Sequence, residues 1–508
     1  MTRILLTILG LLAGRIACEM IASEQTFPSC ASTDDTKVDV SAVCLQIAIS
    51  VSPASGVFFN GTEPYPKDIS HFSASSSQES ACSFEPGMAE DVGTALQILG
   101  KTRTAFAVKG GGHTLNPNFS STPGVQIAMY RFTNVTYDSV AQTATIGAGM
   151  IWDDVYSALE PYGVNVVGAR VSGVGVAGLT LGGGYSWHTN QYGLTVDTVE
   201  AFQLVLPNGT VTDVTASEED LFFALKGGFN NFKNKGIVTQ FTLRAFSQTQ
   251  VWGGTIIYNT SDIGQLTRAT ANFSTNNTDP KAAVITAYGY SKDGDASEVV
   301  TTALLFYDAP TPPEGLFDGF LTNYSETQVF TRSFVSLVQS SGANASYGLR
   351  GAFDTLSVLE YPVEFLQAMV NESLSWGTTL PVGTGYVSYS AEPFLPTIYR
   401  HNTTPSAYPG SRALAFLPTS VNYAWNTDED NVMIKAIKVS TGRLRENAER
   451  TKAVGEAETN LLPLYGNYAL WDTPLEMIYG VHLERLRKVK KEVDPKDVMG
   501  LAGGFKFS

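Results

Sequence analysis

Positive charge, histidine and cysteine are all scarce in this chain of 508 residues, and long apolar runs are nearly absent. The 33 Lys and Arg residues are outnumbered by 48 Asp and Glu, which gives a net charge of −15. Because an acidic surface repels phosphate backbones, the chain is not expected to bind nucleic acid. With 43% hydrophobic and 16% charged residues, it is expected to be globular rather than disordered.

Several catalytic and metal-binding motifs are also missing. The five histidines form no H-x-H or H-E-x-x-H pattern, so no metal site is expected. The four cysteines contain no C-x-x-C, which argues against zinc and thioredoxin-type chemistry. The absence of G-x-S-x-G excludes the nucleophile turn of an α/β-hydrolase.

The one apolar run of note lies at the N-terminus, from Ile4 to Gly14, and Arg3 precedes it. This pattern predicts a secretory signal peptide over residues 1–23, although Arg15 weakens it and a buried N-terminal helix is the alternative. The run is too short to cross a bilayer, and no second run is long enough, so no membrane span is expected.

N-x-[ST] sequons are spread along the chain and predict a secreted, N-glycosylated protein, although a composition rich in Ser, Thr and Asn also generates such patterns. They begin at Asn60, Asn118, Asn134, Asn208, Asn259, Asn272, Asn276, Asn323, Asn344, Asn371 and Asn402.

All four cysteines lie near the N-terminus, at Cys18, Cys30, Cys44 and Cys82. Cys18 leaves with a cleaved signal peptide. A disulfide among the other three is expected to join the N-terminal arm to the first domain, and the sequence leaves the pairing open.

Apolar periodicity up to about residue 246 predicts alternating helices and strands. Helices are expected at 88–101, 151–163 and 218–228, a hairpin around Pro207–Gly209, and a strand at 236–246. From 247 to about 460, longer strands alternate with helices and predict an antiparallel sheet. The tail predicts one helix from Leu475 to Pro495, whose five basic residues form a solvated face. The fold class is therefore α+β.

Gly173 to Gly178 reads GVGVAG and matches the dinucleotide pattern G-x-G-x-x-G, with Asp197 about twenty residues on. That motif requires a helix directly after it, yet Gly182, Gly183 and Gly184 follow within ten residues. Glycine costs roughly 1 kcal/mol per residue inside a helix, so a Rossmann site is not expected.

Two glycine-rich segments instead suggest a single ligand site. Gly110–Gly112 and Gly173–Gly184 lie about sixty residues apart, and glycine lets a backbone approach a ligand with its N–H groups free for anions. Two such loops can clasp a long ligand with a pyrophosphate; ordinary tight turns are the alternative. His113 ends the first loop, where a lone histidine is otherwise a structural residue.

Three segments make a resemblance specific: FAVKGGGHTLNP, VGVAGLTLGGGYSWHTNQYGLTVDTVEAFQLVLPNG, and DLFFALKGGFNNF followed by GIVTQF. They resemble the FAD-binding core of the vanillyl-alcohol-oxidase (PCMH-type) flavoproteins, and within these the berberine-bridge-enzyme-like oxidoreductases. The tail YGNYALW…YGVHLERLRKVKKEVDP resembles the C-terminal segment of that subfamily. The resemblance implies a two-subdomain FAD-binding domain over 40–246, a substrate domain over 247–460 and a returning segment over 461–508.

The resemblance further implies FAD, held by backbone amides of the glycine loop and bonded from His113 to the 8α carbon of the flavin. A neutral imidazole is nucleophilic enough for such a bond. The cofactor contacts carried over are Lys109, Gly110, Gly111, Gly112, His113, Thr114, Gly175, Val176, Gly178, Gly182, Gly183, Tyr185, Gly236, Ile237, Val238 and Asn467.

Three positions depart from the family pattern. Val171 stands where many relatives carry a second, cysteine tether, so a single attachment through His113 is expected. Residues 233–235, KNK, interrupt the usual NNFGIVT. His482 replaces an asparagine common in relatives.

For catalysis the resemblance points to YGNYA, with Tyr468 as general base, Asn467 beside it and Tyr465 as second choice. A tyrosine base needs a pKa well below 10, and core packing is the alternative role. The implied reaction moves hydride from a small organic substrate to FAD and then to O₂, in fungal secondary metabolism. A carbohydrate oxidase, a flavin dehydrogenase and an inactive ligand-binding glycoprotein are the alternatives, and the oligomeric state is left open.

Overall fold

The computed structural model describes residues 39–228, 235–293, 296–341, 346–380, 384–456 and 462–507. Its contacts divide the chain into Met1–Val38 and Asp39–Ser508, and the second unit is the one described. The predicted signal peptide, Cys18, Cys30 and the inserted Lys233 and Asn234 lie outside the described residues.

The first sheet has the order β1-β2-β4-β3, with β2, β4 and β3 parallel and β1 antiparallel. Its parallel strands are buried at every residue, as expected for strands covered on both faces. Helix α3 is shifted by one residue from the helix predicted at 88–101, and it buries its apolar stripe. The strands are β1 (Gly56–Phe58), β2 (Cys82–Glu85), β3 (Phe106–Lys109) and β4 (Val125–Ala128); the helices are α1 (Val40–Ser50), α2 (Tyr65–Ile69) and α3 (Ala89–Thr102).

The second sheet is antiparallel, with the order β5-β6-β10-β8-β9 and β7 paired to β10. The predicted hairpin forms at β8 and β9. The elements are β5 (Val135–Asp138), β6 (Thr143–Gly147), β7 (Val164–Val166), β8 (Val199–Val205), β9 (Val211–Val214), β10 (Ile237–Ser247), α4 (Trp152–Leu159), α5 (Val176–Leu181), α6 (Thr189–Tyr192) and α7 (Glu219–Leu225).

The expectation that no helix follows GVGVAG is wrong. Helix α5 begins directly after Gly175 and ends before Gly182. Gly182, Gly183 and Gly184 do not interrupt the helix because they lie beyond its end, where Gly183 and Gly184 adopt positive φ. The strand before the motif, β7, pairs antiparallel with β10, so the segment is still no Rossmann unit.

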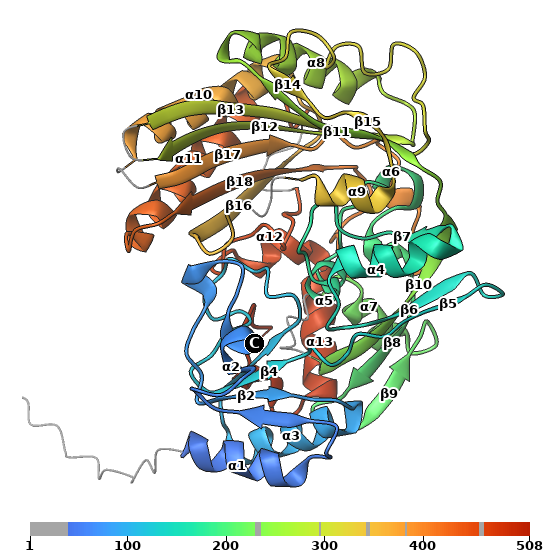
Figure 1. Ribbon diagram of the computed structural model, residues 1–508, viewed down its shortest axis with the longest axis vertical. Coiled ribbons are helices and arrows are strands. Elements are labelled where there is room, and N and C mark those ends of the chain that lie inside the picture. The colour runs from blue at the N-terminus through green and yellow to red at the C-terminus, as the bar shows by residue number, and fades with distance from the viewer. Residues whose placement is uncertain are drawn as a thin grey trace, which may run out of the picture. The chain divides into compact units, whose positions relative to one another are not determined.

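The third sheet is antiparallel, with the order β14-β11-β13-β12-β17-β18-β16 and β15 paired to β11. Helices α8, α10 and α11 cover one face of it (Figure 1). Its elements are β11 (Val251–Tyr258), β12 (Ala282–Asp293), β13 (Ala296–Tyr307), β14 (Glu326–Thr327), β15 (Phe330–Arg332), β16 (Arg350–Val358), β17 (Thr384–Ala391), β18 (Leu417–Trp425), α8 (Ile263–Asn276), α9 (Phe334–Gln339), α10 (Val363–Thr379) and α11 (Asp430–Arg450).

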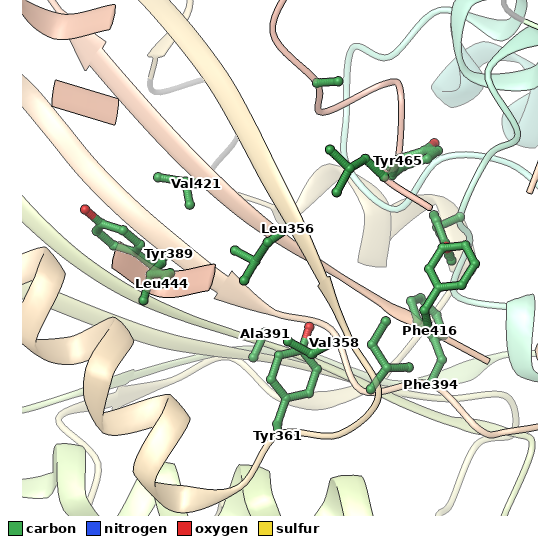
Figure 2. Close-up of a cluster of buried hydrophobic side chains, with 14 of the residues drawn as sticks. Leu356, Val358, Tyr361, Tyr389, Ala391, Phe394, Phe416, Val421, Leu444 and Tyr465 are labelled. Atoms are coloured by element: carbon green, nitrogen blue, oxygen red, sulfur yellow. The ribbon is translucent and has the colours of Figure 1, made fainter. Parts of the chain in front are cut away.

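A hydrophobic core fills the space between this sheet and its helices. Figure 2 shows Leu356 and Val358 of β16 beside Tyr389 and Val421 of the neighbouring strands, with Leu444 of α11 in the same cluster. Because the helices cover this face, side chains at alternate positions of the same strands are left for the other face.

The C-terminal segment is two helices rather than one, which corrects the prediction. Gly480, with φ of 47°, separates α12 (Leu475–Tyr479) from α13 (Leu483–Val493). Helix α13 contacts α7, so the segment returns to the first half of the chain. Four of its five basic residues pair with acids: Arg485, Arg487, Lys488 and Lys490. Lys490, however, is buried against Asp494 rather than solvated.

A disulfide joins Cys44 of α1 to Cys82 of β2. The described sequon asparagines are exposed except Asn402, which is half-buried, and Asn344 lies outside the described residues. No helix in the described part of the chain has the length and apolarity needed to cross a membrane. The α+β fold class is confirmed.

Candidate active site

A cavity of about 570 Å³ lies between the two glycine segments and the face of the third sheet that the helices leave open. The glycine side is built by residues 110–114 after β3 and by Val174, Gly175, Gly178 and Leu179 at α5. Residues 465–469 of the YGNYA motif line it as well.

The two glycine segments touch backbone to backbone. A Cβ on Gly111 would lie 2.6 Å from the Cα of Gly175, so neither position tolerates a side chain. A Cβ on Gly178, by contrast, would meet nothing within 4 Å, and this residue lines the cavity. The segments therefore form a side-chain-free cradle that a large planar ligand can approach closely.

His113 lines the same cavity and has an unused nitrogen. Its Nε2 is buried and has no hydrogen-bond partner among the described residues, and its ring stacks on Phe72 at 4.2 Å between centroids. Burial lowers the pKa of His113 to about 4, so the imidazole is neutral near pH 7. An orphaned, neutral, nucleophilic nitrogen beside a side-chain-free cradle fits covalent attachment of a flavin.

Lys109 has a different environment from the one predicted. Its Nζ donates to the carbonyl of Lys67 at 2.8 Å and to that of Ser70, and burial lowers its pKa to about 8. A Cβ on Gly112 would lie 2.5 Å from its Cε. Lys109 therefore braces residues 67–70 beneath the loop, and its side chain does not line the cavity.

The other residues that the family resemblance implies as cofactor contacts divide into those that line the cavity and those that do not. Thr114 and Tyr185 line the cavity, and the Tyr185 hydroxyl lies 2.6 Å from that of Tyr399. Val176 is buried in α5 and does not line it. Gly183, with φ of 117°, packs under the ring of Tyr408 instead.

The predicted contacts at 236–238 also lie away from this cavity. A Cβ on Gly236 would sit 2.1 Å from the carbonyl oxygen of Val205, so this glycine is required by the sheet. Ile237 and Val238 are buried in β10. The neighbouring Lys235 is buried too, with its Nζ 5.2 Å from the centroid of the Phe507 ring.

Tyr468 is held between two charged side chains. Its hydroxyl accepts from a guanidinium nitrogen of Arg170 at 2.8 Å and donates to Oε1 of Glu392 at 3.0 Å. Arg170 and Glu392 are 2.6 Å apart and 8% and 2% exposed. Because a guanidinium only donates, the phenol proton must point at Glu392.

This arrangement corrects the expectation that Tyr468 has a lowered pKa. Burial and the Glu392 carboxylate raise the pKa of Tyr468 well above its usual 10, and Arg170 offsets only part of this. Tyr468 is therefore a protonated phenol with an acceptor in place, rather than a free tyrosinate.

Asn467 and Tyr465 of the same YGNYA motif are hydrogen-bonded to each other. The Asn467 amide donates to the Tyr465 hydroxyl at 2.7 Å and to the carbonyl of Leu179 at 3.3 Å. A Cβ on Gly182 would lie 2.4 Å from Oδ1 of Asn467, which explains that glycine. The amide is thereby fixed at the junction of α5 and the cavity.

Two positions that depart from the family pattern, Val171 and His482, differ in their relation to the cavity. Val171 lines the cavity, where a second tether would otherwise stand. His482 does not line it: its Nδ1 lies 3.0 Å from the carbonyl of Ala407 and its ring meets Phe223 edge-on.

Sequence reasoning missed Glu392 and Arg170. Each is a lone charge among small and apolar residues, Glu392 directly after β17 and Arg170 in VVGARVSG. A single charged residue in an apolar segment is the signal that sequence analysis could have used, because such a residue is expected to be buried and a buried charge requires a partner.

Comparisons with known proteins agree with this geometry. The family described as FAD binding domain matches residues 80–215. The FAD-dependent monooxygenase drtC of Aspergillus calidoustus is 32% identical over 86% of this chain and 85% of its own length. The FAD-dependent monooxygenase sdcF of Emericella nidulans is 30% identical over 92% and 99%, respectively.

Solved structures share the fold at lower identity. A variant of the berberine-bridge-enzyme-like protein 1 of Physcomitrella patens superposes with a TM-score of 0.72, at 21% identity over 92% of this chain and 98% of that one. Glucooligosaccharide oxidase of Acremonium strictum, described in terms of the functional roles of its 6-S-cysteinyl, 8α-N1-histidyl FAD, gives a TM-score of 0.73 at 17% identity over 92% of this chain and 99% of that one.

Proposed function

Because this chain belongs to the FAD-dependent oxidoreductases of the berberine-bridge-enzyme-like, PCMH-type family, we propose that it is a secreted oxidase of fungal secondary metabolism with FAD attached singly through His113. The observation that carries the attachment is the buried Nε2 of His113, which has no hydrogen-bond partner within the part of the chain that the structure describes. Val171, in place of a cysteine, supports a single bond.

The reaction divides between cofactor and protein. FAD, held by the glycine cradle and His113, would supply hydride acceptance from a substrate carbon and reoxidation by O₂, which gives H₂O₂. The substrate is an alcohol whose O–H proton goes to the Tyr468 oxygen while the phenol proton passes to Glu392 Oε1, 3.0 Å away. The product is a carbonyl compound, and Glu392 later returns its proton to solvent.

Arg170 and Asn467 have supporting roles in this proposal. The guanidinium lies 2.8 Å from the phenol oxygen and stabilises negative charge there as the proton leaves. Asn467 fixes the Tyr465 hydroxyl at 2.7 Å and so holds the second phenol beside the cavity. Both residues hold hydrogen-bonding groups in position before the substrate reacts, so the reaction does not have to reorganise those groups.

Export is supported by two independent features. The Cys44–Cys82 disulfide requires an oxidising compartment, and the exposed sequon asparagines offer glycosylation sites. Secretion from a eukaryotic host, with a mass loss on glycosidase treatment, tests this part. Intracellular retention of an unmodified chain would contradict it.

A monooxygenase is the second candidate, because drtC and sdcF bear that description. A monooxygenase places one oxygen atom of O₂ in the product, whereas the proposed oxidase releases both as H₂O₂. Turnover under ¹⁸O₂ with mass spectrometry of the product distinguishes the two.

The oxidase proposal is tested without knowing the substrate. Purified holoprotein is reduced anaerobically with dithionite and mixed with O₂ while flavin absorbance is followed. An oxidase reoxidises rapidly and yields one H₂O₂ per flavin. Slow reoxidation with rapid reduction of an artificial dye would instead identify a dehydrogenase.

A further inference from the structure

The ring of Phe72 stacks on the imidazole of His113. The two ring centroids are 4.2 Å apart and the ring planes are inclined by 25°, so the rings lie face to face. Stacked aromatic rings attract each other by more than the area that they bury. Both residues line the cavity of about 570 Å³. The stack therefore belongs to the ligand site.

Core packing does not account for Phe72. The described chain has two hydrophobic core clusters, and neither includes Phe72, even among the partly buried residues packed against them. The residue is half-buried. Its ring is nearly perpendicular to that of Tyr347, at 5.8 Å between centroids, and Tyr347 is 62% exposed. Phe72 thus connects the histidine of the cavity with a ring at the surface.

The backbone of Phe72 is fixed on both sides. Its N–H donates to the carbonyl of Gly112 at 2.9 Å, and its own carbonyl accepts from the N–H of Gly348, also at 2.9 Å. The first bond ties Phe72 to the residue directly before His113. The second bond ties it to the segment that leads into β16. A backbone held in this way restricts where the Phe72 ring can lie.

His71, the preceding residue, is anchored as well. Its Nδ1 lies 2.9 Å from the carbonyl oxygen of Ile69, and its Nε2 lies 3.1 Å from that of Ser120. The His71 side chain is buried and does not line the cavity, whereas Phe72 does. The ring of Phe72 is therefore the part of this turn that reaches the ligand site.

Given the proposed attachment of FAD to His113, on which this inference rests, we propose that Phe72 is a positioning residue for that attachment. Its ring restricts rotation of the imidazole and covers one of its faces. The reacting nitrogen is thereby oriented before the flavin binds, and its orientation does not have to be gained during the reaction. Phe72 itself forms no bond to the cofactor.

The covalent step explains why orientation matters. A bond forms between an imidazole nitrogen and the 8α carbon, while one C–H bond of the 8α methyl group and the imidazole N–H bond break. The two protons and two electrons pass to the flavin ring, and O₂ then accepts them as H₂O₂. Because the nitrogen lone pair must point at the carbon, an imidazole that rotates freely reacts more slowly.

The kinetics of attachment test this role. The full-length protein is expressed in a riboflavin-depleted host, and the flavin-free protein is mixed with FAD in air. Acid precipitation of timed samples gives the covalently bound flavin, and the change in flavin fluorescence on mixing gives the non-covalent affinity. Phe72→Leu should attach FAD at least about 10-fold more slowly than the wild type, with its non-covalent affinity changed by less than about 2-fold.

Two further variants distinguish the ring from its surroundings. Phe72→Tyr retains a ring that can stack on His113 and should attach FAD at close to the wild-type rate. Tyr347→Leu is the matched control, because it removes the exposed neighbour of Phe72 and leaves the stack on His113 in place. It should also attach FAD at the wild-type rate. Thermal unfolding of the flavin-free variants shows whether each one folds as the wild type does.

Attachment at the wild-type rate in Phe72→Leu overturns the proposal, and so does equal slowing in Phe72→Leu and Phe72→Tyr. Parallel losses of thermal stability, FAD affinity and attachment rate in Phe72→Leu also overturn it, because they indicate that Phe72 only maintains the fold. A wild-type protein that binds FAD without ever attaching it contradicts the proposed function itself. That result is obtained from the wild type alone, so the two failures are distinguishable.

Discussion

Replacing Glu392 by Gln removes the acceptor of the Tyr468 proton while preserving side-chain size. The phenol lies 3.0 Å from Glu392, and its pKa is raised well above 10. A tyrosine with a pKa of 10 is ionised to only about one part in 10³ at pH 7, and a higher pKa lowers this further. Substrate deprotonation through Tyr468 therefore depends on transfer to the carboxylate.

We expect the rate of flavin reduction in Glu392→Gln to fall by about 10²–10⁴-fold, the usual contribution of a positioned acid–base group. Anaerobic stopped-flow absorbance, with an alcohol that reduces the wild-type flavin, measures this rate.

A loss of reduction rate must be distinguished from a loss of folding stability, because Glu392→Gln leaves the buried Arg170 without its ion-pair partner. Breaking such a buried pair costs about 3–5 kcal/mol. Tyr468→Phe is the matched control: it retains the Arg170–Glu392 ion pair and should lose reduction rate with little loss of stability. Reduction at the wild-type rate in either variant would refute the relay.

Three further predictions concern stability and loading. Burial lowers the pKa of His71 to about 4, so the contribution of this residue to stability is complete above pH 6.5 and is lost as the pH falls. Between pH 7 and pH 5, the free energy of unfolding of the wild type should therefore fall by about 2 kcal/mol more than that of His71→Asn, as measured by urea unfolding. Replacing Cys44 and Cys82, 38 positions apart, by serine should lower the free energy of unfolding by about 3–4 kcal/mol. Gly178→Ala should fold normally, since its Cβ meets open space, yet bind less flavin; unchanged loading would place the cofactor away from this loop.

Local patterns predicted the fold well where a segment's own periodicity decides its structure. Helix α3, the β8–β9 hairpin and strand β10 follow directly from apolar spacing and turn residues. The tail was mispredicted because Gly480 interrupts an otherwise continuous helical pattern at one positive φ.

The site was less predictable because its chemistry depends on distant partners. Tyr468 was identified by its motif, but its protonation is set by Glu392 and Arg170, 76 and 298 positions away. Likewise, the cavity-facing side of β12 follows from a sheet register that no single segment encodes.

The central claim is that His113 carries the flavin, and acid precipitation of the purified protein tests it most directly. The account predicts that flavin colour stays with the wild-type pellet and moves to the supernatant in His113→Ala. The buried, partnerless Nε2 is the basis for this result. Flavin released entirely from the wild-type protein would contradict the claim, as would colour retained by the His113→Ala pellet.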